Sequence, residues 1–288
     1  MVVANDKKHL ISLIYQKIKN HSKSFDEVLD LTSIDVSQIT DMSCLFSGDY
    51  IDAECSNDPI KKELIYFFNK PYIVNISNWN TSRVVDMSFM FEATKIKVDI
   101  SHFDTSNVEN MSSMFMESAF NGDISNWDVS KVRNMKYMFQ HSAFNSDISK
   151  WDVANVEQMQ WMFTGTDFNQ DISSWNVVNV KNMTGMLYDA RFSHDISAWE
   201  MSKNTKTREM FGELKPLRFY IKALRTKNNQ YQLYSMTSRT KFSKRLVCAS
   251  RRARKVQQSN SKYRFIELRN TDKHIVKVLL RNLTLLSK

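Results

Sequence analysis

Residues 127–139 have the sequence Trp-Asp-Val-Ser-Lys-Val-Arg-Asn-Met-Lys-Tyr-Met-Phe, and residues 142–149 continue with Ser-Ala-Phe-Asn-Ser-Asp-Ile-Ser. Variants of this pattern return along the chain with a period of 24 residues. A fixed internal period is typical of repeat proteins, in which each unit packs against its neighbours. The aromatic residue that opens each unit occupies Trp79, Phe103, Trp127, Trp151, Trp175 and Trp199.

An earlier copy of the pattern begins at Ile34, 45 residues before Trp79, so this interval holds one period and an insertion of 21 residues near residues 47–72. Counting this copy predicts seven coils over residues 31–214. The last coil has Asn204 and Thr207 where the pattern has Val and Met. Terminal units of repeat proteins are commonly atypical in this way, because they close the stack.

The spacing of apolar residues within a unit predicts how each coil is built. Ile148, Trp151 and Val153 follow the apolar-x-x-apolar-x-apolar pattern of a leucine-rich-repeat strand. Met159 and Met162-Phe163 stand at i, i+3 and i+4, which favours one face of a helical turn. We therefore expect an α/β repeat solenoid, a leucine-rich-repeat-like stack of short parallel strands and helical turns.

Methionine is concentrated at two positions of the repeat, which hold twelve of the sixteen methionines in the chain. Such columns can indicate a metal or oxidation site, but unbranched methionine also fills the gaps between stacked elements, and we favour the core interpretation. The members are Met42, Met87, Met111, Met135, Met159 and Met183 at the first position, and Met90, Met114, Met138, Met162, Met186 and Met210 at the second.

Residues 1–30 are expected to form an N-terminal helical cap. Asn5 or Asp6 can cap the first turn of a helix that would cover the open edge of the sheet. The apolar residues of this helix lie largely on one side and are Leu10, Ile11, Leu13, Ile14 and Ile18.

The repeated Trp-Asp-Val-Ser-x-Val-x-Asn-Met-x-x-Met-Phe units, with Phe-Asn-x-Asp-Ile-Ser between them, resemble the BspA-like leucine-rich-repeat surface proteins of bacteria. The resemblance covers about residues 31–211 and implies a non-enzymatic adhesion or protein-binding role, commonly at the cell surface. The N-terminus lacks the pattern of a secretory signal, so the chain as written predicts a cytoplasmic protein.

The outward strand position of each coil is the candidate surface for a protein partner. Its acidic members would repel one another along the stack, and a basic partner or a cation would relieve that repulsion. The competing interpretation is a solvated polar face whose side chains bind nearby backbone. The candidate residues are Asp35, Asn80, Asp104, Asp128, Asp152, Asn176 and Glu200.

A second column could bind calcium, as stacked Asp residues do in some β-rolls, but the glycine-rich nonapeptide of those sites is absent and a turn role is favoured. Its members are Asp99, Asp123, Asp147, Asp171 and Asp195. No nucleophile-elbow, phosphate-binding or zinc-protease motif occurs, the six histidines form no column, and the three cysteines have no paired spacing. We therefore expect no enzyme, cofactor or metal.

Residues 215–288 form a basic region, with 20 Lys and Arg against Glu267 and Asp272. Basic clusters with interspersed aromatics can bind nucleic acid or an anionic surface, which is the alternative function. Three other interpretations remain open: a partly disordered solvated arm, a segment docked on the acidic repeats, or a reading-frame artefact. The candidate basic patch is Lys241, Lys244, Arg245, Arg251, Arg252, Arg254 and Lys255.

Overall fold

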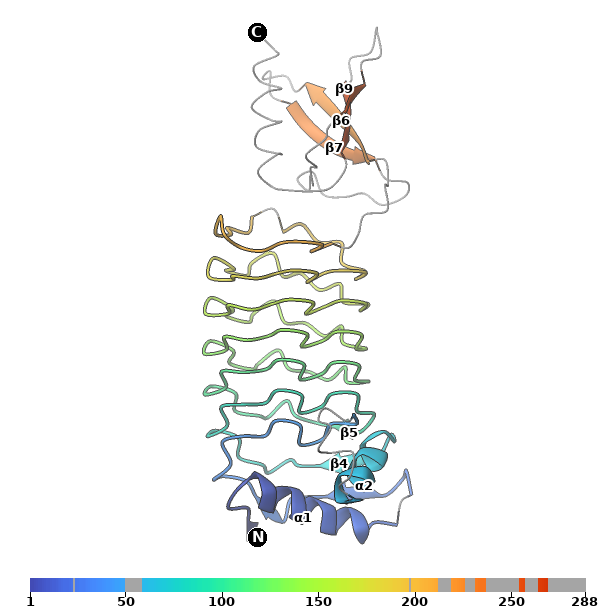
Figure 1. Ribbon diagram of the computed structural model, residues 1–288, viewed down its shortest axis with the longest axis vertical. Helices are drawn as coiled ribbons and strands as arrows, with labels where there is room; N and C mark the ends of the chain where they lie inside the picture. Colours follow the sequence, from blue (N-terminus) through green and yellow to red (C-terminus); the bar gives the residue numbers. More distant parts are fainter. Residues whose placement is uncertain are drawn as a thin grey trace. The chain divides into compact units, whose positions relative to one another are not determined.

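The computed structural model describes residues 1–22, 24–49, 59–196 and 198–211, together with the backbone of four strands nearer the C-terminus. The chain divides into two compact units. The first contains Met1–Phe192 and Trp199–Gly212, and the second contains Ser193–Ala198 and Glu213–Lys288. In Figure 1 the first unit is a stack of similar coils that begins at the N-terminal elements, coloured blue.

The N-terminal elements are strand β1 (Val2–Val3), helix α1 (Lys7–Lys19), and strands β2 (Val28–Asp30) and β3 (Ile34–Asp35). Helix α1 begins after Asp6, whose carboxylate accepts the His9 backbone N–H at 2.7 Å, as an N-cap residue does. Leu10, Ile14 and Ile18, which recur at helical spacing, are its buried residues. The expected N-terminal helix is therefore present, and it contacts β2.

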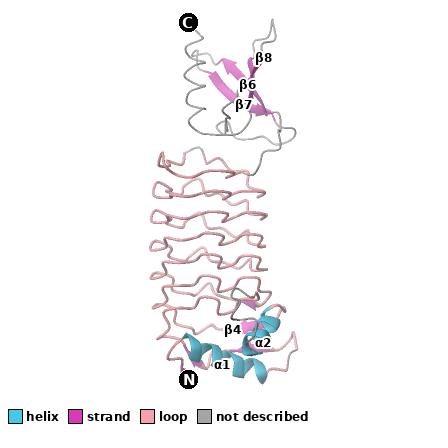
Figure 2. Cartoon of the chain, viewed as in Figure 1, coloured by secondary structure: helices cyan, strands magenta, loops and turns pink. Residues whose placement is uncertain are grey.

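The insertion in the repeat pattern contains helix α2 (Pro59–Phe68), which contacts α1 (Figure 2). After it come strands β4 (Ile73–Asn75) and β5 (Lys97–Val98). Strands β2, β4 and β5 form a parallel sheet in which Val74 pairs with Leu29 on one side and Val98 on the other. Neither described helix is long and apolar enough to cross a bilayer.

The coils are joined by parallel backbone pairing, and we call the resulting arrangement the repeat stack. Isolated parallel bridges link Asp86 to Asn110, Asn110 to Asn134, and Asn134 to Gln158, and the series extends from Asp41 to Lys206. Beyond each bridge, alternate N–H groups donate to the next coil. Tyr137 N–H, for example, donates to the Gln160 carbonyl at 2.9 Å. The expectation of repeated units with short parallel strands is confirmed.

The local structure within a coil differs from the expectation in two places. The Ile148–Val153 segment is not a strand, because Trp151 N–H donates back to the Ile148 carbonyl at 3.2 Å in a tight turn. The Met-x-x-Met-Phe segment is not a helical turn, because it carries the bonds between coils and takes a positive φ at Tyr137 (61°). Tight turns and a helical turn both place the side chains at i, i+3 and i+4 on one side of the backbone. The spacing of the apolar residues therefore could not distinguish the two structures.

Stacked side chains fill the interior of the repeat stack. The ring of Phe139 lies parallel to those of Phe115 and Phe163, with centroids 5.5 and 5.6 Å away. Trp151 is stacked on Trp175, and its Nε1–H donates to the Ile124 carbonyl at 3.0 Å. All twelve column methionines are buried, eleven of them fully, which confirms the core interpretation of those columns.

The described residues of the second unit include four strands, β6 (Phe219–Arg225), β7 (Tyr231–Met236), β8 (Arg254–Val256) and β9 (Arg264–Leu268). They form an antiparallel sheet in the order β7-β6-β9-β8. The basic C-terminal region thus contains a sheet, an element that its composition did not predict.

Candidate functional site

The outward column predicted to bind a partner lies in turns. From Asp35 to Asn176, each side chain accepts the backbone N–H two residues later, as at Asp104 (3.0 Å) and Asp128 (2.9 Å). Short polar side chains commonly stabilise turns in this way. Asp104, Asp128, Asp152 and Glu200 are exposed, so the column combines a structural role with an accessible acidic face. Its role in binding stays a prediction.

The electrostatics of this column follow from the same turns. Hydrogen bonds from Ser130 lower the pKa of Asp128, and hydrogen bonds from the Ser37 backbone and side chain lower that of Asp35. Both carboxylates are therefore ionised near neutral pH, as a surface for a basic partner requires.

The second acidic column makes the same kind of turn. Asp99, Asp123 and Asp147 each accept a serine N–H at 2.8–2.9 Å, and these hydrogen bonds lower their pKa values. Within the residues that the structure describes, no three His, Cys, Asp or Glu side chains are grouped closely enough to hold a metal ion.

A different face of the repeat stack carries half-exposed aromatic rings that the sequence analysis missed. Phe89, Tyr137 and Trp161 occupy the same repeat position, the second variable residue of Met-x-x-Met-Phe, and each has φ between 57° and 61°. Tyr188 lies beside Trp161, with ring centroids 5.7 Å apart. We call these four residues the aromatic strip.

The backbone conformation makes these rings notable. A residue with a Cβ in the left-handed region costs roughly 1–2 kcal/mol, whereas glycine is unstrained there. The same column uses Gly185 in a later coil, so glycine is compatible with the position. Cys44, Ser113 and Glu209 have the same left-handed backbone in their coils, so this conformation belongs to the repeat, and what distinguishes Phe89, Tyr137 and Trp161 is a half-exposed ring at a position that tolerates small residues. The signal visible in the sequence was an aromatic at a position that the core does not require.

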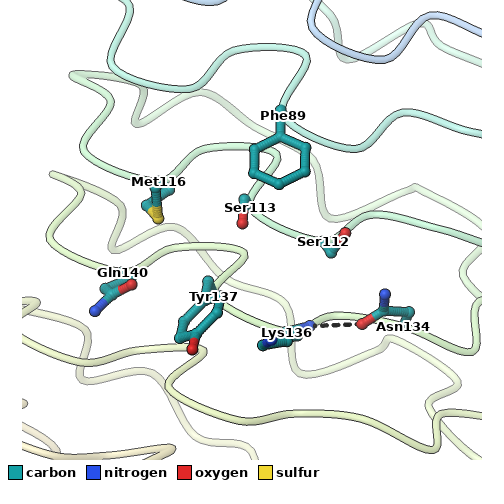
Figure 3. A pocket seen from close by; sticks show the side chains of 8 residues that line it. All are labelled: Phe89, Ser112, Ser113, Met116, Asn134, Lys136, Tyr137 and Gln140. Carbon is teal, nitrogen blue, oxygen red and sulfur yellow. Dashed lines mark hydrogen bonds between the residues drawn. The ribbon is translucent and has the colours of Figure 1, made fainter. Parts of the chain in front are cut away.

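A depression of about 520 Å³ lies between Phe89 and Tyr137, where Ser113 takes the place of an aromatic (Figure 3). Three successive coils contribute to it. Its floor holds Ser113, and the Lys136 ammonium lies 4.7 Å from the centre of the Tyr137 ring. The lining residues are Phe89, Ser112, Ser113, Met116, Asn134, Lys136, Tyr137 and Gln140.

Glu92 is a buried carboxyl group close to the start of the insertion. Glu92 is only 3% exposed, and its Oε2 accepts a hydrogen bond from the Ser47 hydroxyl at 3.3 Å. Burial raises the pKa of Glu92 to about 7, and the neighbouring charges of Asp49 and Glu117 act in the same direction.

The Glu92 carboxyl should make stability fall with pH. Its folded pKa of about 7 exceeds the ordinary 4.5, so its contribution is fully present below pH 4.5 and is lost as pH rises through 7. Between about pH 5 and pH 8, we expect the free energy of unfolding of the wild type to fall by on the order of 1–2 kcal/mol relative to that of Glu92→Gln. This value allows for solvent near the carboxyl, which weakens the effect of burial. Urea unfolding of both proteins across this range measures the difference. Parallel pH profiles would contradict the raised pKa.

The predicted basic patch lies mostly outside the described residues. Lys241, Lys244, Arg245, Arg251 and Arg252 fall there, whereas Arg254 and Lys255 belong to the backbone of β8. The structure therefore leaves this patch as a prediction.

Parallel coils with buried aromatic and methionine columns define the first unit as a repeat protein. The chain belongs to the family described as Mycoplasma protein of unknown function, DUF285, whose model matches residues 60–167, 117–225 and 140–247. These overlapping matches cover more than half of the chain and coincide with most of the repeats. No curated protein and no solved structure matches the sequence.

Proposed function

We propose that this protein is a non-enzymatic binding module that recognises a protein partner through the surface of the repeat stack. The observation that supports this proposal is the aromatic strip, in which Phe89, Tyr137 and Trp161 are held half-exposed on left-handed backbone. Aromatic side chains that remain accessible on a rigid scaffold are the usual energetic centres of protein interfaces.

The charge of the repeats favours a protein over a polyanion as the ligand. Residues 1–214 hold 20 Lys and Arg and 29 Asp and Glu, an excess of acid that repels nucleic acid. The exposed carboxylates of Asp104, Asp128 and Asp152 lie on the same scaffold and suit a basic rim on the partner. In this proposal the aromatic strip contributes most of the affinity. The acidic column attracts a basic partner over a distance and so raises the association rate.

We further propose that the repeat stack is a leucine-rich-repeat-like solenoid of the BspA-like kind, acting in adhesion at a cell surface. The 24-residue period and the parallel pairing between coils support this kinship. Repeat scaffolds keep their core pattern while variable surface residues set the ligand, which agrees with the variable residues of the aromatic strip.

Glycine substitution provides a test of the aromatic strip that spares the fold. The variant Phe89→Gly/Tyr137→Gly/Trp161→Gly removes three rings and relieves three left-handed positions, so we expect its melting temperature to stay close to that of the wild type. Each interface aromatic commonly contributes about 2 kcal/mol or more, so partner affinity should fall by at least ~100-fold. The full chain is immobilised, proteins captured from the native cell and its surroundings are identified, and their affinities are measured.

The charge-reversal variant Asp104→Lys/Asp128→Lys/Asp152→Lys serves as the matched comparison on the acidic column. We expect it to slow association and reduce affinity less than the glycine variant does. Equal capture by the wild type and both variants would reject binding through either face.

The alternative function is nucleic-acid or anionic-surface binding by residues 215–288. The observation that favours it is their charge, with 20 Lys and Arg against two acids. Neutralising Arg251, Arg252, Arg254 and Lys255 should abolish such binding, and the affinity of the wild type should fall steeply with salt. Salt-independent capture that survives this neutralisation would exclude the alternative.

A further inference from the structure

We propose that the depression between Phe89 and Tyr137 is an anchor pocket for one large apolar side chain of the partner, from a segment that places an acidic residue next to it. This inference rests on the proposed protein-binding function and names the chemistry of the partner at the same site.

The space for the anchor comes from Ser113. Coil stacking places Phe89, Ser113 and Tyr137 in one column, and the single small side chain between two rings leaves the depression of about 520 Å³ open (Figure 3). A cavity of this size admits an aromatic or a leucine side chain together with the backbone that carries it.

A small residue at this position is not sufficient to form a pocket. At Gly185, in the same column, a Cβ would overlap the ring of Trp161 from the preceding coil. The Trp161 ring therefore occupies the space above Gly185, whereas Ser113, itself only 2% exposed, lies at the base of a depression that stays open between the coils of Phe89 and Tyr137. The pocket is thus a property of the coils that contain Phe89, Ser113 and Tyr137.

The charge preference comes from Lys136. Its ammonium lies over the Tyr137 ring at 4.7 Å, and it forms no ion pair with any residue that the structure describes. A cation at the wall of an apolar depression attracts a carboxylate, and the partial shielding from water strengthens that attraction. The preferred segment therefore carries Asp or Glu beside its anchor.

The remaining lining suits a peptide. The flexible thioether of Met116 adapts to the shape of an apolar side chain. Gln140 offers an amide group that can bind the backbone of the segment, whereas the Asn134 amide already donates to Asn110 Oδ1 and accepts the Lys136 N–H. Both residues and Lys136 lie on one coil, so the polar groups form one edge of the pocket and the apolar groups of Phe89 and Met116 form the other.

Methyl NMR of the full chain labelled at the methionine methyl groups provides the test, because Met116 lies in the pocket. The probe is a short Gly/Ser peptide with one Trp between two Glu residues. Matched peptides replace Glu by Lys, or Trp by Ala, and a neutral cello-oligosaccharide represents a carbohydrate ligand. We expect the Met116 signal, assigned with Met116→Leu, to shift saturably with a Kd of roughly 1 mM for the first peptide.

Two variants complete the design. Ser113→Trp should fill the pocket and weaken peptide binding at least 10-fold; its thermal unfolding is compared with that of the wild type, because the next coil has Tyr137 where the coil after Trp161 has Gly185. Lys136→Glu should retain the pocket and reverse the preference between the Glu and Lys peptides by about 10-fold. Equal binding of both charged peptides by the wild type, unchanged binding by Ser113→Trp, or saturable binding of the sugar alone would overturn the inference.

These outcomes are separable from failure of the proposed function. Loss of partner capture in the triple glycine variant, combined with no response of Met116 to the peptides, would retain protein binding and reject the anchor pocket. The opposite combination, a peptide response without any captured partner affected by the glycine variant, would reject the proposed function.

Discussion

Replacing Phe139 by Ala should lower the free energy of unfolding by about 3–5 kcal/mol, the usual range for a large aromatic removed from a packed core. Phe139 is fully buried, and its ring contacts rings on both sides and within its own coil. The nearest is Phe144, with centroids 4.1 Å apart, and Phe115 and Phe163 follow at 5.5 and 5.6 Å. Removing the ring leaves a void between three coils. The neighbouring backbone cannot move in to close it, because hydrogen bonds between the coils hold it in place.

Urea unfolding followed by circular dichroism and tryptophan fluorescence measures this loss. Because each coil is stabilised by its neighbours, the damage should spread from the coil of Phe139 to those on either side. The control is Phe139→Leu, which retains an apolar side chain and should lose roughly half as much. A loss below about 1 kcal/mol for the alanine variant would contradict the packed aromatic column.

Replacing Tyr137 by Pro should also destabilise the repeat stack by about 3 kcal/mol or more, for reasons of backbone rather than core packing. Tyr137 has a φ of 61°, which the proline ring forbids. Its N–H donates to the Gln160 carbonyl at 2.9 Å, and proline has no such donor. The substitution therefore breaks a bond between coils and forces a turn out of its conformation.

The control for this backbone argument is Tyr137→Gly, which keeps the N–H donor and favours the left-handed region. We expect its stability to lie within about 1 kcal/mol of the wild type, because the loss of a half-buried ring is offset by the relief of strain. Thermal unfolding of both variants tests the pair. Equal destabilisation by glycine and proline would show that the ring, and not the backbone, carries the effect.

The candidate binding surface was only partly accessible to sequence reasoning. The outward column was found because Asp104 and Asp128 recur with the period, and the structure places them exposed in turns. The aromatic strip was missed because the residue type at its repeat position changes from coil to coil, as from Phe89 to Ser113 to Tyr137. A search for residues that recur with the period therefore does not select it. Functional residues of a repeat protein vary from coil to coil, whereas core residues recur.

The sequence by itself determined the length of the repeat, the burial of its Trp, Met and Phe columns, and an N-terminal helix capped by Asn5 or Asp6, between which the structure selects Asp6. A strict period leaves one register in which those apolar columns stack, so the core follows from the pattern alone. Only the tertiary structure decided that Met135–Phe139 forms turns with positive φ, and that the space beside Ser113 stays open while that beside Gly185 is filled. Both depend on backbone bonds and ring directions from adjacent coils, which no spacing within a single unit encodes.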